Sequence, residues 1–299
     1  MKKEKAYFSG KNILVVQDQE GVKDPEELED LQISDRIILK SSGYTCDEMA
    51  VNENYILTQL RTLPHFNRSN LPDPMILGAG KEALLPYRYR TVLSVYLKPN
   101  CVGIASAQKE LSEFINFSCK EYDLVGHSKG GLLFSGLELE RPTRIVFIAP
   151  TMGTIMGDES LVFKKLTEYQ AQNHCTIPKK SFIALYKWII HLIGSRRPVD
   201  LDMAPNSEFL TNLNLSGLSK HKVLLITATC PQDNCNFQDT FFRYAGSFLG
   251  LDQEGDGMVS LEAQMRIAPY TEKVLNVKST HPSVINNPWT IRAIREFLQ

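Results

Sequence analysis

The chain has 299 residues, of which 43% are hydrophobic and 22% charged, and its formal net charge is −1. These values are ordinary for a folded globular protein and give no reason to expect nucleic acid or an acidic membrane as a partner. No run approaches the roughly 18 apolar residues of a membrane span. We therefore expect one large α/β domain over residues 1–299.

The N-terminus and the cysteines favour a cytoplasmic protein. Residues 1–10 begin with basic side chains but lack the apolar core of a signal peptide. The six cysteines are scattered, and the spacing of Cys230 and Cys235 does not fit a zinc knuckle. We expect reduced thiols, no metal and no cofactor.

Apolar runs in the first hundred residues predict three strands. They are expected at residues 12–16, 36–39 and 91–97. A proline in its first turn favours a short helix over residues 24–31. Prolines, asparagines and glycines interrupt the pattern between residues 43 and 90, so we expect a loop-rich stretch around one helix near residues 52–62.

Strands and helices alternate in the second part of the chain. Helices are expected over 106–117, 130–139 and 288–298, and strands over 122–125, 144–150, 222–229 and 273–277. Alternation of this kind predicts a mostly parallel central sheet with right-handed crossovers and helices on both faces.

The turn after the strand at residues 122–125 can expose a nucleophile. It contains Gly126, Ser128 and Gly130, the G-x-S-x-G pattern that places a serine on a sharp strand-to-helix corner. The chain here resembles the α/β-hydrolase family. The helix that follows directs the backbone N–H of Lys129 toward the site as an oxyanion donor. An ordinary turn between strand and helix is the alternative.

The family resemblance implies that an acid and then a histidine follow the serine in the chain. Of the six histidines, His65 precedes Ser128, His127 lies within the turn, and His221 opens a strand. His174 and His191 fall in an irregular stretch. His281 follows a predicted strand and precedes the terminal helix, where the family carries its base, so it is the predicted base; an ordinary loop histidine is the alternative.

The predicted acid is Asp256. Residues 254–262 resemble the D-G-x-V-P segment of lipase-like members of the family, with Ser260 where proline is usual. The carboxylate would orient the imidazole of His281. Asp252 and Glu254 are competitors, and a simple turn or a cation-binding loop is the alternative, although the spacing excludes an EF-hand.

The alternation of strands and helices stops over residues 151–221, which we expect to form an apolar cap over the site. Large apolar residues are concentrated at 182–193, and a helix packed on the sheet edge is the alternative. Residues 202–214 resemble a stretch of bacterial lipases and esterases that leads from cap to core.

The second oxyanion donor does not follow the family pattern. Most members carry His-Gly after an early strand, and this chain has no His-Gly. The nearest positional match is Ser41-Ser42-Gly43-Tyr44, which predicts the backbone N–H of Tyr44 as the donor.

Together these patterns predict a serine hydrolase of the lipase/esterase type. Ser128 would attack the carbonyl of a small-molecule acyl ester, His281 would move the proton, and Asp256 would orient His281. Thioesters are an alternative substrate class because the same machinery cleaves them. A weakly catalytic or non-catalytic ligand-binding protein on the same fold is a second alternative, and an amidase or peptidase a third. The cap could also contact a lipid interface.

Overall fold

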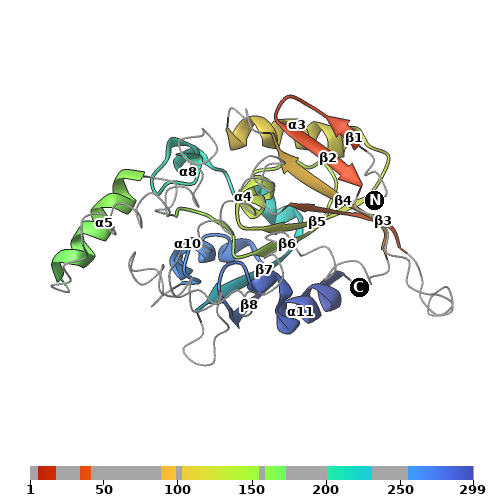
Figure 1. Cartoon of the computed structure of the whole chain (residues 1–299). Coiled ribbons are helices and arrows are strands. Elements are labelled where there is room, and N and C mark those ends of the chain that lie inside the picture. Colours follow the sequence, from red (N-terminus) through yellow and green to blue (C-terminus); the bar gives the residue numbers. More distant parts are fainter. Residues whose placement is uncertain are drawn as a thin grey trace, which may run out of the picture.

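Eight strands form one sheet in the computed structural model, in the order β1-β2-β4-β3-β5-β6-β7-β8 (Figure 1). The structure describes residues 6–17, 34–41, 89–98, 103–154, 159–172, 201–230 and 255–298. The strands from β4 to β8 along this order run parallel to one another. Only the edge pair departs from this direction, since β2 is antiparallel to β4 and β1 to β2. The mostly parallel sheet is therefore confirmed.

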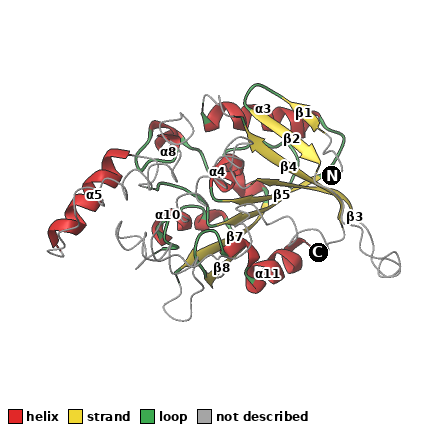
Figure 2. Ribbon diagram, viewed as in Figure 1, coloured by secondary structure: helices red, strands yellow, loops and turns green. Residues whose placement is uncertain are grey.

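The elements have the following bounds. The strands are β1 (Ala6–Ser9), β2 (Ile13–Gln17), β3 (Ser34–Ser41), β4 (Tyr89–Leu97), β5 (Tyr122–His127), β6 (Arg144–Ile148), β7 (Lys222–Thr229) and β8 (Lys273–Lys278). The α-helices are α3 (Ile104–Phe117), α4 (Lys129–Ser135), α5 (Glu159–Gln172), α8 (Glu208–Asn212), α10 (Leu261–Met265) and α11 (Pro288–Leu298), as Figure 2 shows. Short 3₁₀ helices are η4 (Ser216–Lys220), η5 (Ala268–Tyr270) and η6 (Val284–Asn286).

Every strand predicted from an apolar run is present, and β1 was not predicted because it has only four residues. The helix predicted over 130–139 was too long, since α4 ends at Ser135. Beyond its end, the Glu138 N–H donates to Ser112 Oγ and the Asn116 amide donates to the Glu138 carbonyl. Side chains of α3 thus satisfy backbone groups that a longer helix would have used. The helices predicted over 24–31 and near 52–62 lie outside the described residues.

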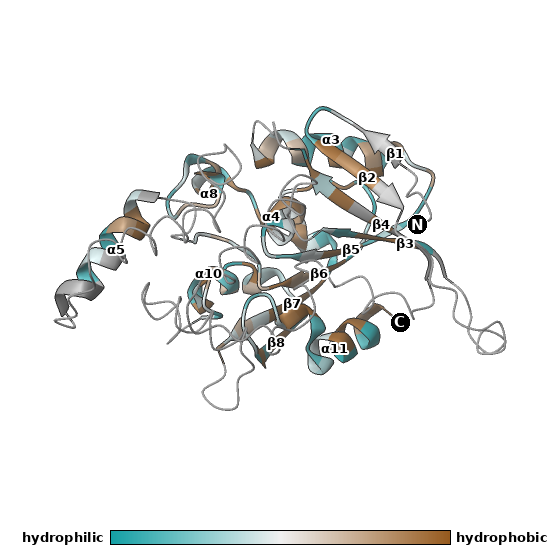
Figure 3. Cartoon of the chain, in the orientation of Figure 1, coloured by the Kyte–Doolittle hydropathy of each residue, from teal (hydrophilic) through white to brown (hydrophobic). Residues whose placement is uncertain are grey.

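The sheet has a hydrophobic core on each face. Alternate residues of β6 divide between the two, with Ile145 and Phe147 on one side and Val146 and Ile148 on the other. Helices α3 and α4 cover the first core, and α11 covers the second. Figure 3 shows the hydrophobic colour concentrated on the central strands, while α11 carries both colours as an amphipathic helix should. The prediction of helices on both faces is confirmed.

A buried charge cluster holds the starting ends of the central strands together. Asp123 of β5 has no exposed surface, and its carboxylate pairs with Arg36 of β3 and Arg144 of β6, each at 2.7 Å. The Arg144 guanidinium also donates to the Leu298 carbonyl at the end of α11. A single carboxylate therefore joins three neighbouring strands and, through Arg144, the C-terminal helix.

The predicted cap over residues 151–221 is described only in part. Helix α5 lies apart from the sheet, beyond α8, in Figure 1. Residues 155–158 and 173–200, including all of the apolar stretch at 182–193, lie outside the described residues. The cap and the single-domain boundaries stay predictions. Within the part of the chain that the structure describes, no helix is both long and apolar enough to cross a membrane.

Candidate active site

Ser128 lies between the end of β5 and the start of α4, on a backbone turn with φ 58° and ψ −126°. Residues other than glycine rarely adopt a positive φ with this ψ, so the turn is strained. The Ser128 N–H donates to the Ile148 carbonyl, and the Ser128 carbonyl accepts from Thr151. These bonds to the end of β6 and to the chain after it hold the strained turn in place, and Ser128 is partly exposed.

The glycines of the turn are required by close backbone contacts. A Cβ built on Gly130 would lie 2.0 Å from the Ser41 carbonyl oxygen, and one on Gly126 would lie 2.7 Å from the Gly130 carbonyl oxygen. Both distances are far below van der Waals contact. The G-x-S-x-G pattern therefore exists here because α4 packs directly on β3 and β5.

Three predicted site residues meet in one hydrogen-bonded chain. His281 Nε2 lies 2.7 Å from Ser128 Oγ, and His281 Nδ1 lies 2.6 Å from Asp256 Oδ2. Asp256 is fully buried and His281 is 2% exposed. Because an ionised carboxylate can only accept, Nδ1 carries the proton and Nε2 accepts from the Ser128 hydroxyl. The imidazole is thus in the tautomer that can take the serine proton.

Asp256 is held by the turn that contains it. The N–H groups of Met258 and Val259 donate to its Oδ1 at 3.0 and 2.8 Å, and its own N–H donates to the Val259 carbonyl. Gly257 has φ 90°, a conformation that glycine adopts at little cost. The carboxylate is therefore oriented with Oδ2 toward His281. The competitors Asp252 and Glu254 lie outside the described residues.

Ser260, where the lipase-like segment usually has proline, caps helix α10. Its Oγ accepts from the Ala263 N–H at 3.2 Å. Its φ of −64° is one that proline also adopts. The departure from the family pattern therefore leaves the shape of this turn compatible with the predicted role of Asp256.

His127 supports the turn that carries His281. Its Nε2–H donates to the His281 carbonyl at 2.9 Å, and the two rings lie 4.8 Å apart. Burial, with a smaller contribution from the neighbouring His281, lowers the pKa of His127 to about 3. His127 is therefore neutral at ordinary pH. The His281 N–H in turn donates to the Asp256 carbonyl, so the backbone also joins the acid and base turns.

The predicted oxyanion donors are placed unequally. Lys129 is the first residue of α4, directly after Ser128. Tyr44 lies outside the described residues. However, Ser41 ends β3 beside Gly130, as the close approach of its carbonyl oxygen shows. The end of β3, three residues before Tyr44 in the sequence, therefore lies beside the turn that carries Ser128.

Of the histidines set aside in the sequence, His221 lies away from the hydrogen-bonded chain of Ser128, His281 and Asp256. Its Nδ1 accepts from the Thr143 N–H, and burial lowers its pKa. His65, His174 and His191 lie outside the described residues. Two polar residues around the site, His127 in this supporting role and Gln264 of α10, were not predicted from the sequence.

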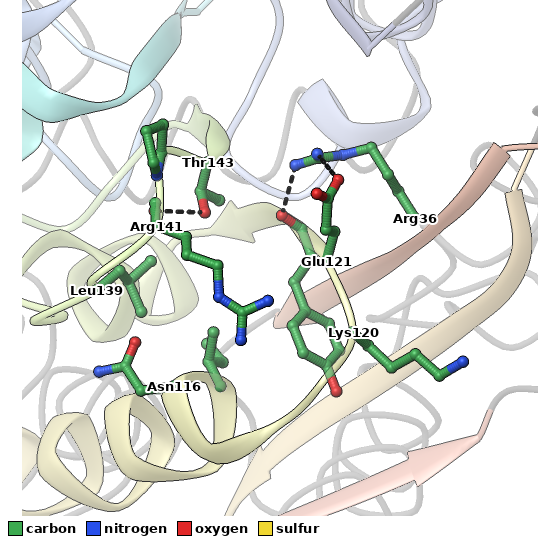
Figure 4. Close-up of a pocket in the computed structure, with 10 residues that line it drawn as sticks. Arg36, Asn116, Lys120, Glu121, Leu139, Arg141 and Thr143 are labelled. Carbon is green, nitrogen blue, oxygen red and sulfur yellow. Dashed lines mark hydrogen bonds and ion pairs between the residues drawn. The ribbon is translucent and has the colours of Figure 1, made fainter.

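A small cavity of about 30 Å³ lies near the starting ends of β3 and β5, whereas Ser128 lies past the other end of β5. It is lined by Arg36, Glu121 and Arg141, among others, and Figure 4 shows Arg36 bound to Glu121 at its rim. This volume is close to that of one water molecule. Tyr122 in its lining starts β5, whereas Ser128 follows the end of that strand, so the cavity is not part of the site. Among the described residues, no group of three metal-ligating side chains could hold a metal ion.

Comparisons with known proteins support the fold. No family model matches the chain, and no curated protein sequence does. The mature lipase BlEst2 of Bacillus licheniformis aligns with 96% of this chain and 98% of its own, with a TM-score of 0.55 at 14% identity. An esterase from Pyrococcus furiosus aligns with 99% of this chain and 90% of its own, with a TM-score of 0.47 at 11% identity. An α/β hydrolase fold protein from Chitinophaga pinensis covers 99% and 97%, with a TM-score of 0.45 at 11% identity.

Of these three likenesses, only the one to the Bacillus lipase has a TM-score high enough to carry an argument, and at 14% identity it shows the fold alone. The chain therefore has the α/β-hydrolase fold, as predicted.

Proposed function

We propose that the chain is a serine hydrolase that cleaves carboxylic esters through an acyl-enzyme at Ser128. The observation that carries this proposal is the hydrogen-bonded chain Ser128–His281–Asp256, with contacts of 2.7 and 2.6 Å, at a strained turn between strand and helix. Each group stands in contact with the one it would act on. The cost of holding Ser128 at φ 58° is unexplained if the serine has no function.

The reaction follows from these contacts. His281 Nε2 takes the hydroxyl proton as Ser128 Oγ attacks the acyl carbonyl, and Asp256 stabilises the imidazolium that forms. The imidazolium then donates its proton to the leaving alkoxide, which departs as an alcohol. Water, deprotonated by His281, attacks the acyl-enzyme, releases the carboxylic acid and restores Ser128.

The oxyanion would be held by the backbone N–H groups of Lys129 and Tyr44. Lys129 is supported by its position at the start of α4, and Tyr44 by the contact of Ser41, three residues earlier, with Gly130. Loss of one such donor costs about 3–4 kcal/mol of transition-state stabilisation in a comparable enzyme.

The substrate class follows from the predicted cap. We propose that residues 151–221 cover the site and bind an aliphatic acyl or alcohol group. The same segment could contact a lipid interface. Exposed large apolar side chains in this segment support this, since Phe163 is 48% and Leu201 55% exposed. Thioesters stay an alternative substrate class.

A fluorophosphonate probe tests the nucleophile. The wild type should be labelled and Ser128→Ala should not. Ser135→Ala is a matched control, because Ser135 is a buried serine of the same helix whose Oγ donates to the Leu132 carbonyl, away from the triad. Labelling that persists in Ser128→Ala would remove Ser128 from the mechanism.

Turnover tests the reaction. The wild type should hydrolyse at least one p-nitrophenyl ester between two and sixteen acyl carbons. Acyl thioesters assayed in parallel distinguish the two substrate classes. Labelling without turnover of any ester or thioester would instead favour the binding-protein alternative.

A further inference from the structure

Gln264 of helix α10 is buried beside the acid turn and has four contacts within hydrogen-bond distance, three of which share the two protons of its Nε2. Its Oε1 accepts from the Ala228 N–H at 2.7 Å, and its Nε2 donates to the Ala228 carbonyl at 3.0 Å. The same Nε2 lies 3.1 Å from the Val259 carbonyl and 3.3 Å from Asp256 Oδ2. The residue has no exposed surface. One amide therefore contacts β7, the acid turn and the acid itself.

The bonds to Ala228 fill a place left open in the sheet. The Ile226 carbonyl of β7 accepts from Ala149 at the end of β6, and residues two apart on a strand direct their backbone groups to the same side. The backbone groups of Ala228 therefore point beyond the end of β6, where Thr151 already donates to Ser128. The Gln264 amide supplies the donor and the acceptor that a longer β6 would have given.

The fourth contact reaches the carboxylate oxygen that binds the histidine. Asp256 Oδ1 is held by two backbone amides, while Oδ2 accepts from His281 and from Gln264. Without the Gln264 amide, the His281 ring would be the one remaining donor to Oδ2 among the described residues. The carboxylate could then rotate about its Oδ1 contacts.

We propose that Gln264 is a positioning residue that fixes Asp256 Oδ2 for His281 by tying the acid turn to β7. This inference rests on the proposed function, in which His281 acts as the base. A displacement of about 1 Å in a catalytic group can cost up to about 100-fold in rate. We therefore expect Gln264→Met, which has a similar volume and no amide, to lower kcat by about 10-fold to 100-fold with little change in KM.

A double-mutant cycle separates positioning from a structural role. If Gln264 acts through Asp256, Gln264→Met should lower kcat by less than about 2-fold in an Asp256→Ala background, because the carboxylate that it orients is gone. Equal losses in both backgrounds would overturn the proposal. Should Gln264→Met fail to fold, Gln264→Asn carries the same test, because it keeps a neutral amide on a side chain one methylene shorter, which weakens the joint contact with Ala228 and Asp256.

A matched control comes from Gln108, a buried glutamine of α3 whose amide donates to the Leu132 carbonyl. Gln108→Met should leave kcat within about 2-fold of wild type.

Proton NMR gives a readout that does not need turnover. The proton on His281 Nδ1, which lies 2.6 Å from Asp256 Oδ2, should give a far-downfield resonance in the wild type and in Gln108→Met; the distance joins the nitrogen and the oxygen. In Gln264→Met it should broaden or disappear through exchange with water. An unchanged resonance in Gln264→Met would overturn the proposal. If the resonance is lost in Gln264→Met but the wild type hydrolyses no ester, the positioning role is supported and only the proposed function is rejected.

Discussion

Replacing Ser128 with glycine should give a more stable protein than replacing it with alanine. Ser128 has φ 58° and ψ −126°, a conformation that costs a non-glycine residue about 1–3 kcal/mol. Glycine adopts positive φ without this cost. Both variants lose the hydrogen bond between Ser128 Oγ and His281, so the difference between them reports the backbone alone.

The size of the difference follows from two opposing contributions. Relief of strain favours glycine by about 1–3 kcal/mol, and the larger entropy of glycine in the unfolded chain opposes it by about 0.5–1 kcal/mol. The net expectation is about 1 kcal/mol in favour of Ser128→Gly, or roughly 2–4 °C in Tm for a large domain.

Calorimetry and urea unfolding measure this difference, and neither variant should react with a fluorophosphonate. Ser112 of α3 provides the control, since it lies in the interior of a helix. There the order should reverse, with alanine more stable than glycine by about 1 kcal/mol. If Ser128→Ala equals or exceeds Ser128→Gly in stability, the turn is not strained and the reasoning fails.

Three further changes test the framework around the site. Asp123→Asn should destabilise the fold by about 3 kcal/mol, because two largely buried arginines lose the carboxylate that they share while Arg36 keeps Glu121; a loss below about 1 kcal/mol in urea unfolding would contradict this. Gly130→Ala should cost at least about 1–3 kcal/mol, because its Cβ would lie 2.0 Å from the Ser41 carbonyl oxygen, and wild-type stability would refute that contact. The lowered pKa of His127 means that the unfolded chain binds a proton there between pH 6.5 and about 3 while the folded chain does not, so stability should fall with falling pH. His127→Gln should remove about 2 kcal/mol of the loss between pH 6.5 and about 5, and identical pH profiles would count against a buried neutral His127.

The sequence predicted the sheet and the three residues that the structure brings into contact, for identifiable reasons. Parallel strands buried on both faces read as continuous apolar runs, as at 222–229. The order of Ser128, Asp256 and His281 along the chain, together with their positions after strands, singled out these residues before the structure placed them in contact.

The supporting residues could not be predicted because their partners are distant in sequence. His127 binds the carbonyl of a residue 154 positions later, and Gln264 binds Ala228 36 positions earlier. Neither contact leaves a pattern in the nearby sequence from which it could be predicted. The end of α4 was missed for a similar reason, since side chains of α3 replace the bonds of a further helical turn.

The shortness of β6 has a consequence for how this site could change. The chain leaves the sheet at Ala149, which has φ 42°. The Gln264 amide therefore binds the backbone N–H and carbonyl of Ala228 in place of a further β6 residue. One more paired residue in β6 would expel that amide from the end of β7. The length of β6 thus decides whether Gln264 can join the turn of Asp256 to β7. On the proposed role of Gln264, substitutions that extend pairing beyond Ile148 should displace Asp256 Oδ2 from His281.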